Sequence, residues 1–136
     1  MVECNYNYSS NESFLKRVEE ILAEHNKAMS IEKNEYFEYS LKDDVLLVCG
    51  LKGRFSNNYV SVATLWVDEK YKNKYLGNKL INYLEEVARE RGFDNIILST
   101  CTFQAKRFYE KLGYNVIGIT KDVPLEFDYH IMIKRV

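Results

Sequence analysis

Hydrophobic residues recur along this chain with two spacings, one typical of helices and one typical of strands. Apolar residues three and four positions apart predict helices in three segments, 11–26, 76–91 and 104–112. Short apolar or aromatic runs bounded by Gly, Asn or Asp predict strands in six others, 35–41, 45–50, 59–67, 96–99, 114–119 and 129–133. The expected order is one helix, three strands, a helix, a strand, a helix and two strands.

Turn signals separate these segments. Ser9 and Glu12 have the spacing of a capping box at the start of the first helix. Residues 42–44 and 53–58 are rich in Asp, Gly and Asn, which predicts turns on either side of the second strand. Glycines just after the second and third helical patterns are placed to end those helices. The first two strands are therefore expected to form a hairpin.

The element order predicts the class of fold. Its middle part alternates strand and helix, which favours a partly parallel sheet, and the hairpins on either side favour antiparallel pairing. We expect an α/β (α+β) fold in which helices cover a mixed sheet. The chain has 136 residues and no internal repeat or linker, so a single domain over residues 1–136 is expected.

Composition excludes some classes of function. The formal net charge is −1, so no general electrostatic attraction to nucleic acid or to an anionic membrane is expected, and any anion site must be local. No apolar run is long enough to span a bilayer, and the polar N-terminus does not resemble a signal peptide. The three cysteines and two histidines show no metal-ligand spacing. We expect a cytoplasmic, reduced protein without a metal.

One segment, residues 60–91, organises the chain: an apolar strand, a short basic loop and a long amphipathic helix. Unpaired N–H groups and the helix dipole at a helix N-terminus favour bound phosphate, and lysines in the loop would assist. The alternative is a solvated, lysine-rich turn that opens a surface helix. The candidate phosphate-binding residues are Lys72, Asn73, Lys74, Tyr75, Leu76, Gly77, Asn78 and Lys79.

Two separate segments resemble a known family. LWVDEKYKNKYLGNKLINYLEE resembles the acetyl-CoA motif of the GNAT superfamily of N-acyltransferases, in which a loop of the type Arg/Gln-x-x-Gly-x-Gly/Ala joins strand to helix. FQAKRFYEKLGYNVIGI resembles its C-terminal motif, Asn-x-x-Ala-x-x-Phe-Tyr-x-x-x-Gly-Phe. The resemblance covers residues 45–136. Lys72 replaces the usual Arg or Gln, Tyr75 occupies the first glycine position, and Gly77 is retained.

The resemblance implies a GNAT-like mixed, centrally splayed sheet flanked by helices, with acetyl-CoA as co-substrate. The backbone of Leu65, Trp66 and Val67 would pair with the cofactor's amide-bearing arm, as an added strand does. Gln104 and Phe108 would lie beside the cofactor. Three basic residues on the last helix could reach a phosphate or could simply face solvent: Lys106, Arg107 and Lys111.

Tyr109 is the catalytic candidate that the resemblance implies. A phenol close to the sulfur can stabilise or protonate the thiolate that leaves when an amine attacks a thioester. The alternative is a packing role, since the chain has 11 tyrosines. No general base is assigned: Asp68, Glu69, Glu126, Asp128 and His130 are alternatives, and an already neutral amine or water-mediated deprotonation would need no dedicated base.

The expected function is acetyl transfer from acetyl-CoA to a primary amine of a small molecule or peptide, by direct attack in a ternary complex. The alternative is a catalytically silent acyl-CoA-binding or interaction module on the same fold. The acceptor site is expected from segments 35–41, 53–58 and 121–128, whose acidic residues would suit a cationic amine: Glu35, Glu38, Asp122, Glu126 and Asp128. Relatives often form homodimers, for which the edge of a terminal strand would be a natural contact.

Overall fold

The computed structural model describes residues 2–3, 11–28, 34–122 and 126–136. The chain separates into two compact units, residues 1–33 and 34–136. In the first unit, helix α1 spans Glu12–Ala28, close to the predicted 11–26. Asn11 Oδ1 accepts a hydrogen bond from Phe14 N at 3.1 Å and so caps this helix. Ser9, the predicted capping residue, lies outside the described residues.

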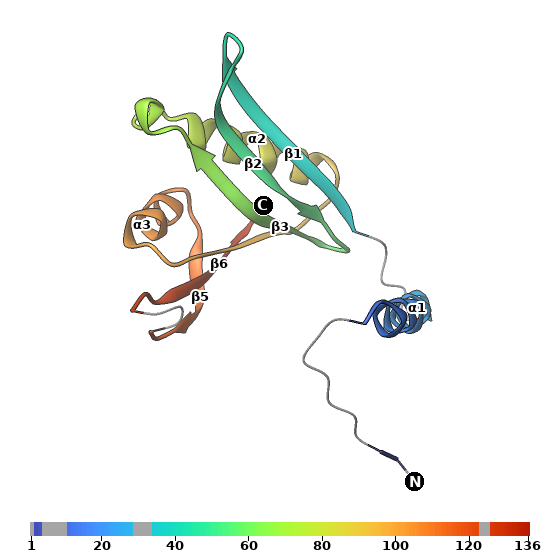
Figure 1. Ribbon diagram of the computed structural model, residues 1–136. Coiled ribbons are helices and arrows are strands. Elements are labelled where there is room, and N and C mark those ends of the chain that lie inside the picture. The colour runs from blue at the N-terminus through green and yellow to red at the C-terminus, as the bar shows by residue number, and fades with distance from the viewer. Residues whose placement is uncertain (1, 4–10, 29–33, 123–125) are drawn as a thin grey trace. The chain divides into compact units, whose positions relative to one another are not determined.

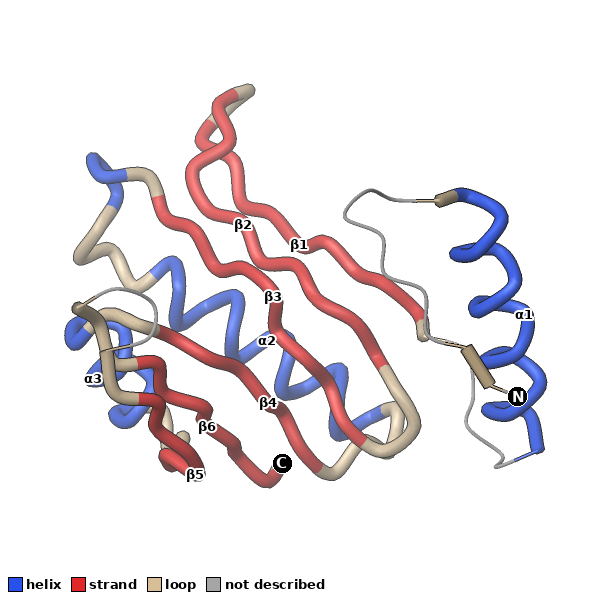
Figure 2. Tube along the Cα trace, turned by 60° about the horizontal axis from the view of Figure 1, so that its bottom comes forward, coloured by secondary structure: helices blue, strands red, loops and turns tan. Residues whose placement is uncertain are grey.

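The second unit contains a six-stranded mixed sheet in the order β1-β2-β3-β4-β6-β5 (Figures 1 and 2). Its strands are β1 (Glu35–Asp43), β2 (Leu46–Phe55), β3 (Tyr59–Val67), β4 (Asn95–Thr100), β5 (Asn115–Thr120) and β6 (Tyr129–Arg135). Its helices are the short 3-10 turn η1 (Glu69–Tyr71), α2 (Leu76–Glu90) and α3 (Phe103–Lys111). Of the strand pairs in the described part of the chain, only β3–β4 is parallel. The predicted element order and the α+β class are confirmed.

The predicted end of the second strand was wrong. Strand β2 does not stop at Gly50 but continues through Phe55, so residues 53–55 belong to a strand and not to a turn. Buried Leu51, Gly53 and Phe55 alternate with the more exposed Lys52 and Arg54 along it. This alternation is that of a strand with one face on the core.

The core lies on the face of the sheet covered by α2. The helix turns an apolar stripe toward β1, β2 and β3, and the stripe is fully or almost fully buried: Leu80, Ile81, Leu84 and Ala88. Cys49 on β2 is buried in the same cluster, and burial raises the pKa of its thiol.

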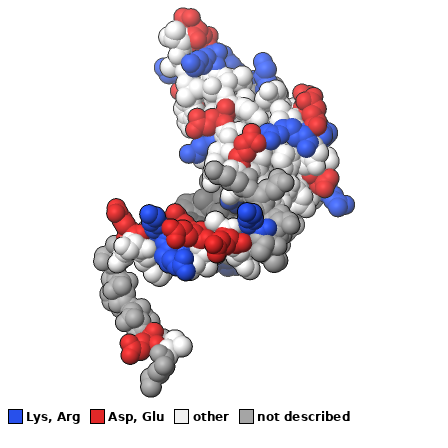
Figure 3. Space-filling view, turned by 90° about the vertical axis from the view of Figure 1, so that its right-hand side faces the viewer, with Lys and Arg blue, Asp and Glu red and all other residues white. Residues whose placement is uncertain are grey.

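On the face of the protein that Figure 3 shows, basic and acidic side chains are interspersed.

The sheet is split between its two middle strands. Strands β3 and β4 pair only over Tyr59–Ser61 and Asn95–Ile97, and beyond Ser61 the edge of β3 that faces β4 is unpaired. The two strands visibly diverge in Figure 2. In the ladder with β2, Lys52 pairs with Thr64 and Gly53 with Val62, so Ala63 is the extra residue of a bulge. The expected central splay is therefore present, and it begins at a bulge.

Gly53 is the residue that makes this bulge sterically possible. A Cβ atom at Gly53 would lie 2.1 Å from the backbone oxygen of Ser61 and 2.9 Å from the ring of Phe37. We expect Gly53→Ala to lower the free energy of unfolding by at least about 2 kcal/mol, because backbone atoms must move. Urea unfolding monitored by circular dichroism measures this loss.

Gly50→Ala is the matched control on the same strand, since a Cβ atom there meets nothing within 4 Å. Its unfolding free energy is expected to stay within about 0.5 kcal/mol of the wild-type value or to rise slightly. Equal effects of the two substitutions would contradict the steric role of Gly53.

Candidate active site

The segment after β3 is held in place by local hydrogen bonds. Asp68 caps η1 by accepting from Lys70 N at 2.9 Å. Tyr71 Oη donates to Asp43 Oδ2 at 2.5 Å, which joins η1 to the end of the β1–β2 hairpin. This bond raises the pKa of Tyr71, because it is made only by the protonated phenol, which donates to the Asp43 carboxylate. The loop that follows is therefore anchored at its start.

Helix α2 begins at Leu76, so the last four residues of the predicted phosphate loop form the first turn of the helix. Tyr75 is the N-cap residue and makes no side-chain capping hydrogen bond. The N–H groups of Leu76, Gly77 and Asn78 point out of the helix end, where no residue four positions earlier can accept them within the helix. By contrast, α3 is capped by Thr102, which accepts from Ala105 N at 3.2 Å. The α2 N-terminus is the better place for an anion.

Two properties of glycine are found at separate positions here: a left-handed backbone conformation at Tyr75 and the absence of a Cβ atom at Gly77. Tyr75 has φ 58° and ψ 24°, a left-handed conformation that glycine adopts without steric cost. Gly77 instead lies in the helix, where an added Cβ would be 3.2 Å from Phe108 Cζ and 3.7 Å from Leu65 Cδ2. The retained glycine therefore allows the start of α2 to pack against α3 and β3.

A cleft of about 860 Å³ lies at this helix end. Its lining brings together most of the predicted site residues: Leu65, Trp66, Val67, Lys72, Asn73, Tyr75, Leu76, Gly77, Asn78, Gln104, Phe108 and Tyr109. Lys74 and Lys79 are not part of the lining. These positions fit a cofactor that runs from the start of α2 along the unpaired edge of β3.

The basic residues around the cleft differ in how far they are already engaged. Lys72 pairs with Glu69 at 2.7 Å, and the Lys74 ammonium lies 5.1 Å from the centre of the Tyr71 ring. Arg107 and Lys111 of α3 line the cleft, whereas Lys106 pairs with Glu110 at 3.7 Å. Two of the three basic residues on α3 that the sequence indicated, Arg107 and Lys111, therefore line the cleft.

Tyr109 lies at the inner wall of the cleft and is 7 % exposed. Its ring makes edge contacts with Phe108 and Tyr114 at centroid separations of 5.1 and 5.6 Å. Burial raises the pKa of the Tyr109 phenol to about 12. The phenol is therefore protonated at neutral pH, and it can donate a hydrogen bond but cannot act as a base.

Sequence reasoning missed three lining residues: Tyr71, Thr102 and Ala105. Thr102 and Ala105 could have been predicted from the helical pattern, because they lie at the same end of α3 as the predicted site residue Gln104. Tyr71 could not, since its position depends on the contact with Asp43 on a distant strand.

Three of the carboxylates considered as general bases are engaged in other contacts. Glu69 pairs with Lys72, and Asp68 caps η1. Asp128 accepts from Asp122 N and pairs with Lys121, each at 3.1 Å, and these contacts hold its pKa below the usual range. Glu126 and His130 do not line the cleft. The base stays unassigned.

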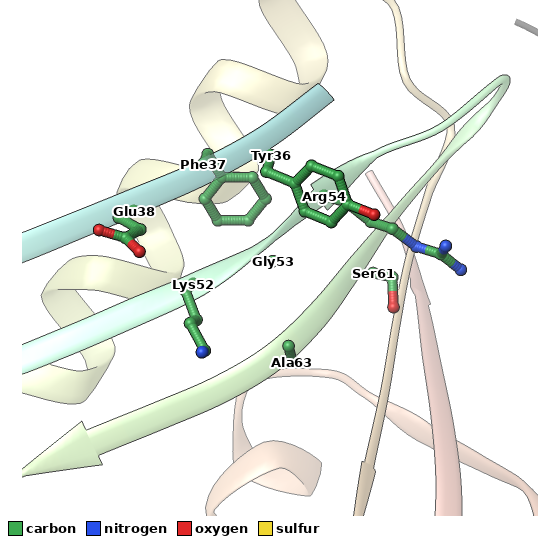
Figure 4. A pocket seen from close by; sticks show the side chains of 8 residues that line it. All are labelled: Tyr36, Phe37, Glu38, Lys52, Gly53, Arg54, Ser61 and Ala63. Carbon is green, nitrogen blue, oxygen red and sulfur yellow. The ribbon is translucent and has the colours of Figure 1, made fainter. Parts of the chain in front are cut away.

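A second cavity, of about 690 Å³ and called the groove below, opens on the face of the sheet opposite to α2 (Figure 4). Three strands supply its lining: Tyr36, Phe37 and Glu38 of β1, Lys52, Gly53 and Arg54 of β2, and Ser61 and Ala63 of β3. The predicted acceptor segments 35–41 and 53–58 thus contribute to it. The third predicted segment does not line it, and its residues 123–125 lie outside the described residues.

Two further features concern metal and membrane. Among the described residues, no group of three or more His, Cys, Asp or Glu side chains is arranged to hold a metal ion. No described helix is both long and apolar enough to cross a bilayer.

The split sheet and the helix that begins beside it agree with the arrangement that the resemblance to the GNAT superfamily implies. The sequence pattern of the Acetyltransferase (GNAT) family matches residues 8–114. The chain therefore belongs to the GNAT acetyltransferase family and is an acyltransferase of that type.

Individual relatives agree with this assignment. Blasticidin-S acetyltransferase of Streptomyces morookaense is 32% identical over 101 residues, which cover 74% of each chain. The fold matches the crystal structure of an acetyltransferase from Bacillus cereus with a TM-score of 0.86 at 23% identity, over 97% of this chain and 98% of that one. It also matches an aminoglycoside 6′-N-acetyltransferase complexed with coenzyme A, with a TM-score of 0.68 at 20% identity, over 92% of this chain and 81% of that one.

The raised pKa of Tyr109 predicts a pH-dependent contribution to stability. Between its ordinary value of 10 and about 12, the folded protein keeps the proton that the unfolded chain releases. The contribution is therefore complete below pH 10 and is lost as the pH rises toward 12, on the order of 2 kcal/mol. We expect the unfolding free energy of Tyr109→Phe to fall less steeply over this range than that of the wild type.

Urea unfolding at closely spaced pH values from roughly 9 to 12 measures this difference in the pH dependence of the unfolding free energy. Tyr83→Phe is the control, because it removes a phenol that is 50% exposed on α2. A wild-type slope in Tyr109→Phe would show that the buried phenol is not the source.

Proposed function

We propose that the protein transfers an acetyl group from acetyl-CoA to a primary amine of a small molecule or peptide, by direct attack in a ternary complex. The observation that supports this most is the make-up of the larger cleft. It combines an uncapped helix N-terminus, an unpaired strand edge and a buried phenol. A pyrophosphate, an amide-bearing arm and a thioester need these three features in that order.

Each part of the site has a separate task. The N–H groups at the start of α2 hold the pyrophosphate, with Arg107 and Lys111 adding positive charge. The edge of β3 at Leu65–Val67 pairs with the amide-bearing arm as an added strand would. Acetyl-CoA supplies an activated acyl group, and amine attack on its carbonyl carbon breaks the C–S bond, with the electron pair leaving on sulfur.

Tyr109 stabilises the departing sulfur by donating a hydrogen bond. An ordinary thiol has a pKa of about 8.5, well below the value of about 12 for this phenol. The thiolate is therefore a weaker base than the phenolate, which favours hydrogen-bond donation over full proton transfer. The main role of Tyr109 is thus donation to the developing thiolate, and the proton that the amine loses goes to water.

The acceptor is expected to be a small molecule. The relative with the highest identity given above acts, by its name, on blasticidin S. The groove on the opposite face of the sheet is of a size for a small ligand, at about 690 Å³.

Tyr109→Phe tests the chemical role of the phenol. We expect kcat to fall about 10- to 100-fold, because one hydrogen bond to the leaving group is lost, while acetyl-CoA affinity is retained. Thiol release during turnover measures kcat, and calorimetric titration with CoA measures affinity. Tyr83→Phe should match the wild type in both.

Two results would contradict the proposal. Absence of CoA binding to the wild type would remove the cofactor assignment of the cleft. Binding of CoA without thiol release from acetyl-CoA, across amines that include blasticidin S, would favour a silent binding module.

A further inference from the structure

Three charged side chains line the groove on the open face of the sheet: Glu38, Lys52 and Arg54. Among the described residues, Glu38, Lys52 and Arg54 form no ion pair. Arg54 donates one hydrogen bond, to the Tyr59 hydroxyl at 3.3 Å. The remaining donors of both cations are available to a ligand.

Strand register places the two cations side by side over the groove. Lys52 lies opposite Thr64 of β3, and Arg54 lies opposite Ser61. Residues two apart on a strand face the same side at a separation of roughly 7 Å, within reach of one acidic group for side chains this long. In Figure 4, Lys52 leaves β2 on the side of Ala63, whereas Arg54 leaves it at the Ser61 end and its guanidinium extends past Ser61.

The groove leads to the split in the sheet. Ser61 is the last residue of β3 that pairs with β4, and Ala63 is the bulge residue. Leu65, two positions further along the same strand, already lines the larger cleft. A ligand in the groove can therefore present one end at the opening between β3 and β4, where the acyl group is expected.

The other acidic residues expected at an acceptor site are placed differently. Arg91 pairs with Glu35 at 2.6 Å, and this contact holds the pKa of Glu35 below its usual range. Asp128 pairs with Lys121. Of the five acidic residues considered from the sequence, only Glu38 lines the groove, and it shares the groove with two cations.

Building on the proposed acetyl transfer, we propose that the acceptor is an amine that also carries an acidic group, a carboxylate or a phosphate. Lys52 and Arg54 bind the acidic group, and the amine lies toward Ala63 and the split. A charge-assisted hydrogen bond to either cation anchors the acceptor in one direction. The groove thereby selects amino acids and amino phosphates over purely cationic amines.

The alternative is that these side chains only solvate the sheet face, as many surface charges do. The two explanations differ in one respect. A solvating face has no preference between an acceptor with an acidic group and its neutral counterpart, whereas a binding groove has one.

The test uses amines that differ only at the far end of the chain: ω-amino carboxylates of three to six carbons, their carboxamides, the matching aminoalkyl phosphates and the diaminoalkanes. Amide shifts of Lys52, Gly53 and Arg54 in nitrogen-15 NMR spectra report binding with CoA present, and thiol release reports turnover. At the best chain length, we expect an acidic member to bind about tenfold more tightly than its carboxamide. The carboxylate and phosphate series show which acidic group fits.

Substitutions identify the source of the preference. Lys52→Gln and Arg54→Gln should each reduce it, and Lys52→Glu should shift it toward the diaminoalkane, a gain that misfolding cannot mimic. Lys42→Gln removes a positive charge from β1 outside the groove lining and should leave the preference intact.

Equal binding of the acidic and neutral members, or no shifts at the groove amides with any of them, would overturn the inference. So would a preference that survives both Lys52→Gln and Arg54→Gln. CoA titration of the same samples is read separately: loss of CoA binding rejects the acetyl transfer proposal, whatever the groove binds.

Discussion

The active-site geometry depends on one constraint, the early end of pairing between β3 and β4. Three residues of each strand pair, and then the strands part. The cause lies on the other side of β3, where the extra residue Ala63 forms a bulge against β2. A bulge bends its strand and increases its twist, so it turns β3 away from β4 just beyond Ser61. The split is therefore built into the ladder with β2 and does not require a ligand to open it.

The split leaves backbone groups without partners, and buried backbone groups in proteins are nearly always paired. Two features keep the halves of the sheet together despite this. Strand β4 remains in register with β6 up to Thr100, and the core beneath both halves is continuous, from Leu51 through Leu84 to Met132. The unpaired edge is thus supported by a rigid scaffold, as a site that binds an extended ligand through its backbone requires.

Most of the fold was predictable because hydrophobic spacing is a local signal. The order of elements and the bounds of β3 follow from it directly. The end of β2 did not, because Gly53 and the Asn residues after it indicate a turn, whereas Gly53 is there for a close approach that only the tertiary structure reveals. Because the second strand was predicted to end at Gly50, Lys52 and Arg54 were not recognised as neighbours on one face of a strand. Their alternation with Leu51 and Phe55 is the signal that indicates this.

The candidate site was predictable to the extent that it follows a contiguous motif. Six of the eight predicted loop residues line one cleft with Phe108, whereas Lys74 and Lys79 do not. The separate tasks of Tyr75 and Gly77 could not be foreseen, because backbone conformation at a helix start depends on how the preceding loop is anchored. Here Tyr71 anchors that loop to Asp43, 28 positions earlier in the chain.

The interior of the cleft explains why no carboxylate base accompanies Tyr109. Burial that raises the pKa of the phenol would also raise that of a carboxyl group beside it and disfavour a charged amine there. Among the described residues, those that line the cleft include no Asp or Glu. In the proposed reaction, an amine must therefore lose its proton before it passes the split. The groove at Ser61 and Ala63 is open to water, so an ammonium group can lose its proton there. The proton that the attacking nitrogen releases when the amide forms also goes to water, and the buried phenol stabilises the charge that develops on sulfur.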